Sequence, residues 1–364
     1  MSMIGTFLVR SGILTSVHAF AVDPTRGTFI LALLAINIGG ALALFVARAG
    51  TIAEGERFAP LSREGALVIN NVALSAVLGI VLLGTLYPLL TEAFGVRVSV
   101  GPPYFNPVSA VFVFPMLLVL AVGPLLRWRR DRFARIKRPV IAVAAVAAIV
   151  LLALWLVARI AFLELLGVAL ATTVAVAAFL PLRGRSLRRL PLPVWGMAIA
   201  HFGVAVALFG MAVDTAFTVE KLTAANVGDT VAVGPWQVRL SAVEPVAGPN
   251  WTALSGRLSA SYSGGAGHLL VPQSRTFWAP PQTTSESALL TRWNGQLYTV
   301  IGQQTQDGRW QLRLWWKPFV TFIWFGGVLI GLGGLLALIG RVSVDVRRRV
   351  AIRKIAARRA ETAR

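Results

Sequence analysis

The sequence predicts an α-helical polytopic membrane protein with about seven transmembrane helices and one small antiparallel β domain outside the membrane. Hydrophobic residues make up 56% of its 364 residues, charged residues make up only 14%, and the mean hydropathy is +0.71. Apolar residues gather in runs that can cross the ~30 Å hydrocarbon core of a bilayer as helices. Residues 214–317 differ, because apolar and polar residues alternate there as they do in strands.

Seven apolar runs are long enough, or nearly so, to be spanning helices. Each must be helical, because lipid cannot hydrogen-bond an open backbone. The runs cover residues 28–47, 66–90, 107–126, 139–156, 163–182, 194–213 and 318–339. Only a few residues separate the fourth run from the fifth, so we expect a tight hairpin between them.

Basic residues between the runs predict the orientation. The loops after the first, third and fifth runs contain three, seven and four Lys or Arg residues, and the tail from Arg341 onward contains nine. The opposite short loops contain one each, Arg97 and Arg159. Because Lys and Arg favour cytoplasmic loops, we expect the basic loops inside and residues 214–317 outside. The formal net charge of +20 is then explained by membrane topology, because the basic residues lie between the apolar runs. We therefore expect membrane lipid, and no nucleic acid, as a partner.

The predicted β domain contains several alternating stretches. VAVGPWQVRLSAV (residues 231–243) and WQLRLWW (residues 310–316) are examples, and Gly, Pro and Asn divide such stretches. Trp315 and Trp316 precede the last apolar run, so we predict that they anchor the chain at the membrane interface. The predicted segments are an external motif, a six-helix membrane region, the β domain, a final helix and a basic cytoplasmic tail, at residues 1–27, 28–213, 214–317, 318–340 and 341–364.

The residue types present point away from acid–base and thiol chemistry. The chain contains no cysteine, which excludes disulfides and cysteine metal sites. Neither paired carboxylates nor a Ser, His and Asp set is evident, so any chemistry would depend on a cofactor. The candidate ligands are the three histidines, His18, His201 and His268. His268 follows a glycine-rich stretch, and we expect it in a surface loop of the β domain.

His18 lies in a segment of unusual texture, GTFLVRSGILTSVHAFAVDPTRG (residues 5–27). Small and hydroxyl residues alternate there with Leu, Ile, Val and Phe, and an Asp-Pro-Thr-Arg-Gly turn closes the segment before the first apolar run. Composition alone leaves two interpretations open. His18 is either a structural side chain or an exposed imidazole that binds a metal at the membrane surface.

This segment resembles, almost residue for residue, a motif of CcmF-type subunits of bacterial cytochrome c haem lyase. The resemblance covers nearly the whole chain. It is carried further by SREGALVINN (residues 62–71), LLGTLYPLL (82–90), GPPYFNPV (101–108), GPLLRWRRD (123–131) and WKPFVTFIWFGGVLIGLGGLLAL (316–338). One stretch departs from the family pattern. PQSRTF (residues 272–277) keeps only the Pro, the Arg and the aromatic residue of a family motif that also contains Glu and Lys.

The resemblance implies a role in cytochrome c biogenesis in the bacterial inner membrane, with the β domain in the periplasm. A haem chaperone would deliver haem to the outer face near His18, where its vinyl groups would accept the thiols of apocytochrome c. Other cytochrome c maturation subunits would be further partners. A haem b within the membrane would relay electrons, and the family's histidine in the matching span is an axial ligand of that haem, which implies His201.

His201 lies in the sixth apolar run, about 12 Å from a helix start marked by Pro193. An ionisable side chain at that depth is a functional candidate, and haem ligation, a proton relay and a structural hydrogen bond are the alternatives. Its helix face also carries Met197, Ala198, Val204 and Ala205. Three of these are slim enough to let a flat macrocycle approach. The opposite face predicts a helix-packing seam of Gly196, Gly203 and Gly210, which recur every seven residues.

The number of histidines limits what this chain can do alone. A low-spin haem b takes two axial ligands, and no apolar run except the sixth contains a histidine. Either the second axial ligand comes from outside this chain, or the haem is held from one side only. His18 also needs a partner, and the resemblance implies that this partner and a Trp-rich segment lie upstream of the His18 motif. We therefore expect the chain to be the carboxy-terminal half, a haem lyase subunit that is inactive without the amino-terminal half. The alternatives are a haem transmembrane transporter and a non-catalytic assembly scaffold.

The charge distribution gives a testable topology. A reporter enzyme that is active only outside the cytoplasm should be active when fused within residues 214–317 and inactive when fused after Arg341. The activities of the two fusions in intact cells measure this directly. The reverse pattern would overturn the predicted orientation and with it the placement of His18 on the outer side.

Overall fold

The computed structural model describes residues 2–11, 23–51, 57–96, 98–157, 161–279 and 281–362. The chain divides into two compact units. The first unit comprises Met1–Met116 and Arg127–Asp131, and the second comprises Leu117–Leu126 and Arg132–Arg364.

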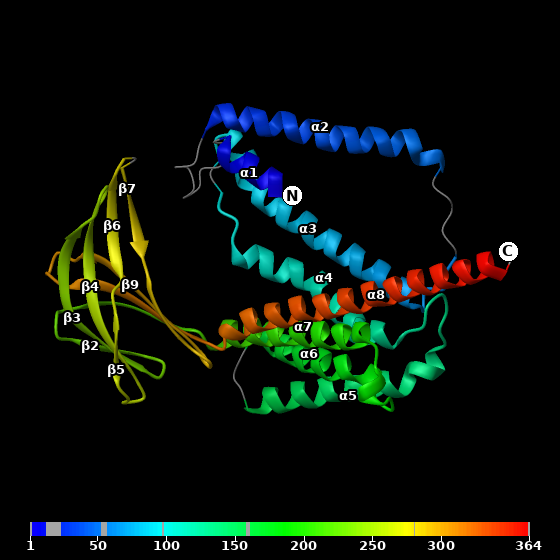
Figure 1. The fold of residues 1–364 in the computed structure, drawn as a ribbon. Coiled ribbons are helices and arrows are strands. Elements are labelled where there is room, and N and C mark those ends of the chain that lie inside the picture. The colour runs from blue at the N-terminus through cyan, green and yellow to red at the C-terminus, as the bar shows by residue number, and fades with distance from the viewer. Residues whose placement is uncertain are drawn as a thin grey trace. The chain divides into compact units, whose positions relative to one another are not determined.

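Helices make up the first unit and much of the second (Figure 1). The α-helices are α1 Ser2–Arg10, α2 Pro24–Arg48, α3 Arg63–Ala93, α4 Pro102–Val122, α5 Phe133–Val157, α6 Phe162–Phe179, α7 Leu192–Phe217 and α8 Thr321–Thr362. Among the described residues, seven helices, α2 to α8, are long and apolar enough to cross a membrane. The predicted fold class, a multi-pass helical membrane protein with one β domain, is confirmed.

In the first unit, the loop Arg127–Asp131 binds the start of α3. The backbone N–H of Asp131 donates to Leu61 O at 2.8 Å, and that of Arg63 donates to Arg127 O at 2.9 Å. Ser62 is fully buried and caps α3, because its Oγ accepts the N–H of Gly65 at 3.0 Å. Two of the recognised motifs, residues 62–71 and 123–131, are therefore joined. The charge count assigned both basic loops to one side of the membrane, as this contact requires.

A second pair of motifs meets between α3 and α4. A Cβ placed on Gly84 would lie 2.5 Å from Cε1 of Phe105 and 2.7 Å from Cε1 of Tyr104. Gly84 belongs to LLGTLYPLL, and both aromatic residues belong to GPPYFNPV, which forms the first turns of α4. Only glycine leaves room for these two rings, so this contact accounts for the small residue in the middle of α3.

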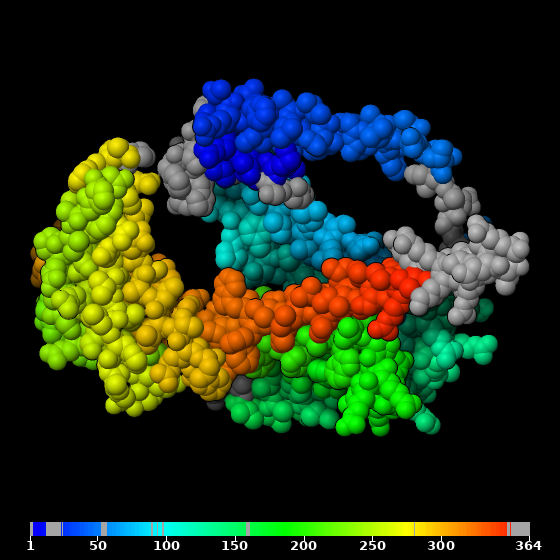
Figure 2. Space-filling view, viewed as in Figure 1, coloured from blue at the N-terminus to red at the C-terminus, as the bar shows by residue number. Residues whose placement is uncertain are grey.

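In the second unit, α7 and α8 are antiparallel and their backbones are in contact along the predicted glycine seam. A Cβ on Gly203 would lie 2.7 Å from Gly326 O and 2.7 Å from Ile330 N. Gly196 meets Gly333 in the same way, seven residues along each helix. The seam is confirmed, and the orange part of α8 lies directly against green helices of the same unit in the space-filling view (Figure 2).

α6 packs on a different side of α7 from α8. A buried cluster links α4 to α7 through Ala121, Val143, Val174, Ala177 and Ala205. Phe179 at the end of α6 also contacts Phe202 of α7, with ring centroids 5.4 Å apart. α7 is therefore held on two sides, by α6 through small side chains and by α8 through direct backbone contact.

Within the described residues, ten strands form the β domain in two antiparallel sheets. They are β1 Val219–Ala225, β2 Thr230–Val233, β3 Trp236–Ala247, β4 Trp251–Tyr262, β5 Gly267–Leu270, β6 Gln273–Trp278, β7 Pro281–Glu286, β8 Ala288–Arg292, β9 Gly295–Gln304 and β10 Trp310–Pro318. One sheet has the order β1-β10-β9-β8. The other has the order β2-β3-β4-β6-β7, with β5 also paired to β4. Alternate side chains of both sheets bury a shared core, as the period of two predicts.

Two sequence predictions in this domain are wrong. Trp316 is not an interface anchor, because it is 7% exposed and packs in the core with Trp236 and Tyr262 at ring distances of 6.2 and 6.1 Å. Its neighbour Trp315 lies on β10 against Tyr298, not at a span entry. The last span accordingly begins at Thr321 and not at residue 318, because strand β10 extends to Pro318.

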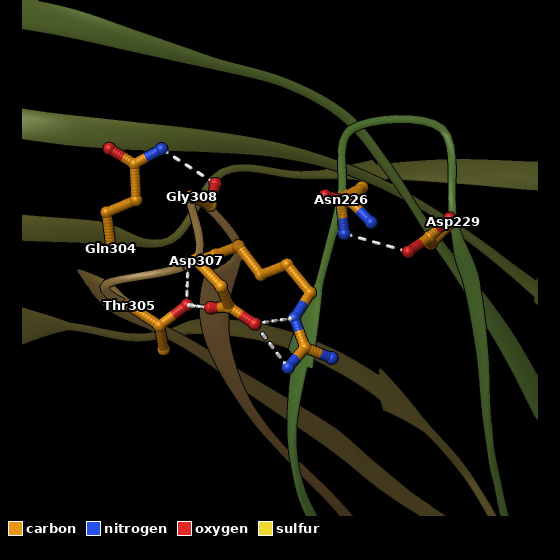
Figure 3. Close-up of polar contacts among 7 residues, drawn as sticks. Asn226, Asp229, Gln304, Thr305, Asp307 and Gly308 are labelled. Carbon is orange, nitrogen blue, oxygen red and sulfur yellow. Dashed lines mark hydrogen bonds and ion pairs between the residues drawn. The ribbon is translucent and has the colours of Figure 1, made fainter.

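Two polar turns close one end of the β1–β10 sheet (Figure 3). In the turn between β1 and β2, Asp229 Oδ2 accepts the N–H of Asn226 at 2.8 Å. In the turn between β9 and β10, hydrogen bonds from Thr305 and then Arg309 hold the pKa of Asp307 below its usual value. Each carboxylate is thus used by its own turn, so we assign both residues a structural role.

The seam generates a prediction with a matched control on the partner helix. Gly203→Ala should destabilise the protein by about 1–3 kcal/mol, because its Cβ meets backbone atoms that cannot move independently. Gly331→Ala should be neutral or slightly stabilising, because no atom lies within 4 Å of its Cβ position. Thermal unfolding midpoints in detergent measure both. Equal midpoints for the two variants would show that the seam does not hold the helices together.

Candidate functional site

His201 lies on α7 and is half-buried. Its Nδ1 is 2.8 Å from the backbone oxygen of Met197, one turn earlier on the same helix. Since a carbonyl oxygen can only accept, Nδ1 donates in this contact, and in the neutral imidazole Nε2 then carries the lone pair. A histidine whose Nδ1–H is held by a carbonyl is oriented as metal-binding histidines usually are, with Nε2 as the ligand atom.

The helix faces around His201 differ in exposure. Ala198 is fully buried and Ala205 is 2% exposed, since both are covered by packing against neighbouring helices. Met197 and Val204 remain half-buried. Of the three slim residues predicted to admit a macrocycle, the structure therefore leaves only Val204 on the accessible side. The expectation for the two alanines is wrong, because both are buried, and Ala205 packs in a cluster with Val174 and Ala177 of α6.

α7 holds the imidazole on a rigid support. Gly203, on the opposite face of α7, has backbone contact with α8, and Phe202 contacts the end of α6. The ring itself is tied to the helix backbone through Met197 O. Because both the helix and the ring are fixed, the direction of Nε2 is set before any ligand binds.

His18 lies outside the described residues, but the residues on either side of its segment are described. The N–H of Asp23 donates to Arg10 O at 2.9 Å, so the ends of the segment are joined. Asp23 also caps α2, because Oδ1 accepts the N–H of Arg26 at 3.1 Å. The predicted Asp-Pro-Thr-Arg-Gly turn is thus the first turn of α2. Gly27 lies close to α1 there, because a Cβ placed on it would lie 3.1 Å from the Cα of Ser11.

His268 is not in a loop as predicted. It lies on the short strand β5, paired with Ala260 of β4, and its side chain is exposed. No group of three or more Asp, Glu or His side chains is arranged to hold a metal ion within the described part of the chain.

Sequence reasoning missed several residues that hold the structure together. Asp131 accepts the N–H of Arg127 at 2.9 Å, and Glu64 accepts that of Arg129 at 2.7 Å. Asp214 of α7 pairs with Lys317 at 3.7 Å. The available signal was an acidic residue among many basic ones or at the edge of an apolar run. That signal indicates a partner without identifying it.

Arg275 shows what remains of the altered family motif. It donates from Nε to Gln273 Oε1 at 2.9 Å, lies 3.8 Å from Glu286, and stacks over the ring of Trp251 at 4.4 Å. These contacts all lie within the β domain. They give Arg275 a structural role on strand β6, although Gln and Ser replace the family's Glu and Lys.

Known proteins are similar to the β domain and also to nearly the whole chain. The sequence profile described as the CcmF C-terminal beta-sandwich matches residues 216–318. The cytochrome c-type biogenesis protein CcmF of Haemophilus influenzae is 36% identical over 353 residues, which are 94% of this chain and 54% of that protein. CcmF of Escherichia coli strain K12 is 38% identical over 344 residues, which are 93% of this chain and 53% of that protein.

A solved structure titled "Cytochrome c Heme Lyase CcmF" is similar with a TM-score of 0.69 at 25% identity. The similarity covers 87% of this chain and 51% of that one. The chain thus spans about half the length of the curated relatives it matches. The chain has the helices of a multi-pass membrane protein and a β-sandwich, and its relatives are named cytochrome c-type biogenesis proteins. These features place it in the class of multi-pass membrane proteins of cytochrome c biogenesis. Within that class, the chain belongs to the CcmF family.

Proposed function

We propose that this chain is part of a cytochrome c haem lyase that works at the periplasmic face of the bacterial inner membrane. Relatives at 36–38% identity are named cytochrome c-type biogenesis proteins, and the similar solved structure is titled a haem lyase. The observation that carries the proposal is the orientation of His201 by Met197 O at 2.8 Å within a membrane-spanning helix. An imidazole fixed in this way is suited to ligate an iron centre.

In this proposal His201 is one axial ligand of a haem b in the membrane. When bound there, a haem b would supply one-electron redox chemistry. The chain's own contribution is the oriented Nε2, an apolar helix face that limits water, and a rigid α7. The residues present fit such a group on one side, with Val204 and Met197 beside the imidazole. We place the second axial ligand in the part of the longer relatives that this chain does not cover.

His18 is proposed to receive the external haem, which is a substrate and not a resident cofactor. The segment that contains it is tethered at both ends by the contact between Arg10 and Asp23. Each thioether would form when a cysteine S–H of apocytochrome c adds across a haem vinyl group, so that one carbon of the vinyl group gains the sulfur and the other gains the hydrogen. Haem would arrive from a haem chaperone, and other cytochrome c maturation subunits would present the apocytochrome.

His201 has a direct test in the complete system, in which the rest of the relatives' length is supplied. His201→Gly should remove the low-spin spectrum of the reduced membrane haem, and added imidazole should restore part of it, because imidazole can fill the space left by the side chain. His268→Ala is the matched control and should leave the spectrum unchanged, because His268 is exposed on β5. Optical spectra of the purified complex measure all three. A low-spin spectrum that survives the loss of His201 would show that another residue is the ligand.

The same system separates the two proposed haem positions. His18→Ala should abolish cytochrome c maturation while the spectrum that depends on His201 persists. Covalent haem on a reporter cytochrome measures the first property, and the optical spectrum measures the second. Normal maturation in the His18 variant would leave the segment with a structural role. If both histidines proved dispensable, a non-catalytic scaffold would replace the lyase proposal.

A further inference from the structure

We propose that the turn between β8 and β9, centred on Trp293, is a lipid-interface anchor that seats the β domain at the headgroup level of the membrane beside α8. The sequence suggested Trp315 and Trp316 for this role, but Trp316 is buried in the sandwich core. The β domain of a membrane protein still needs a defined position at the interface. The structure offers another tryptophan there.

The turn is bound directly to the start of the last span. Thr321, the first residue of α8, donates from Oγ1 to Trp293 O at 3.0 Å. The backbone N–H of Phe319 donates to Asn294 O at 2.9 Å. The rings of Trp293 and Phe319 are also in contact, with centroids 6.2 Å apart. These three contacts fix the turn at the depth at which α8 begins.

Charged side chains mark that depth as the polar boundary. Lys317, four residues before Thr321, pairs with Asp214 near the end of α7 at 3.7 Å, with side chains 35% and 18% exposed. An ion pair is strongly disfavoured in hydrocarbon, so the bilayer core must begin beyond it. Trp293 contacts Phe319, between this pair and the first residue of the span. The turn therefore lies at the junction of headgroups and acyl chains.

The exposed side chains of this region are aromatic and continue onto α8. Trp293 is 69% exposed, and Trp324 and Phe325 in the first turn of α8 are 76% and 55% exposed. Arg292 does not share the outward position of Trp293, because its guanidinium stacks on Tyr262 of the sandwich at 4.5 Å. Indole, with an apolar body and one N–H donor, prefers this level of a bilayer to either water or hydrocarbon.

Phospholipid is the occupant favoured by continuity with the span. The exposed faces of α8 beyond Thr321 carry large apolar residues, including Val328, Ile330 and Leu332. An aromatic side chain fixed at the end of such a helix enters the same environment that the helix occupies. A protein surface that covered Trp293 would have to displace lipid from that position. The experiment below distinguishes the two cases.

The absence of cysteine gives a clean test, because one introduced thiol can be labelled alone. W293C and W278C, each carrying a nitroxide, are compared in nanodiscs of equal parts phosphatidylethanolamine and phosphatidylglycerol. Trp278 is a matched control, since it is 55% exposed and also lies beside a β-hairpin turn. That turn is remote from Trp316. Phe277, next to Trp278, pairs with Trp251 at one end of β4, whereas Tyr262, which contacts Trp316, lies eleven residues away at the other end of that strand.

Each label is tested for accessibility to dioxygen, which concentrates in lipid, and to a water-soluble nickel chelate. The ratio of the first accessibility to the second should be several-fold higher at position 293 than at position 278. Equal ratios would place Trp293 in water, and an immobile label shielded from both reagents would place it against protein; either result overturns the proposal. W293F, which keeps a ring at this position, guards against misfolding of W293C. Brominated lipid should quench the tryptophan emission of the original chain more than that of W293F, and equal quenching would also overturn the proposal.

Discussion

The direct backbone contact between α7 and α8 is the constraint on which the rest of the second unit depends. Glycines at seven-residue spacing let the two helices approach until Gly203 and Gly326 touch. Helices in lipid gain little from the hydrophobic effect on association, so close packing of this kind is a main source of their attraction. The contact determines which face of α7 remains for other uses, and His201 lies on that other face.

The same pair of helices carries the β domain. β1 follows α7, and β10 leads into α8, so the sandwich is attached to the membrane by two adjacent helix ends. The ion pair between Asp214 and Lys317 and the contact of Phe209 with Phe319, at 5.8 Å, tie these ends together. Phe319 adopts a φ of 55°, an uncommon value for a residue other than glycine, where the chain turns from strand to helix. The rigid helix pair that orients His201 thus also supports the sandwich.

Contacts between distant segments explain several of the recognised family motifs. Residues 62–71 and 123–131 are bound together by backbone hydrogen bonds, and Gly84 leaves space for Tyr104 and Phe105. These stretches of the first unit therefore have a structural role, since they hold separate elements in contact. The two ends of the His18 motif are likewise held by Arg10 and Asp23.

The sequence by itself determined the seven spans, the β domain and the glycine seam, because length and period are properties of local sequence. It also made His201 a candidate ligand, because an ionisable side chain within a span carries an energetic penalty. Tertiary structure alone decided which exposed faces remain. It buried Trp316 and left Trp293 outward, and it covered Ala198 with a neighbouring helix while Val204 stayed half-exposed. The tautomer of His201 also required coordinates, because it depends on one oxygen at 2.8 Å. Such outcomes depend on contacts between distant segments, and periodicity along the chain contains no information about them.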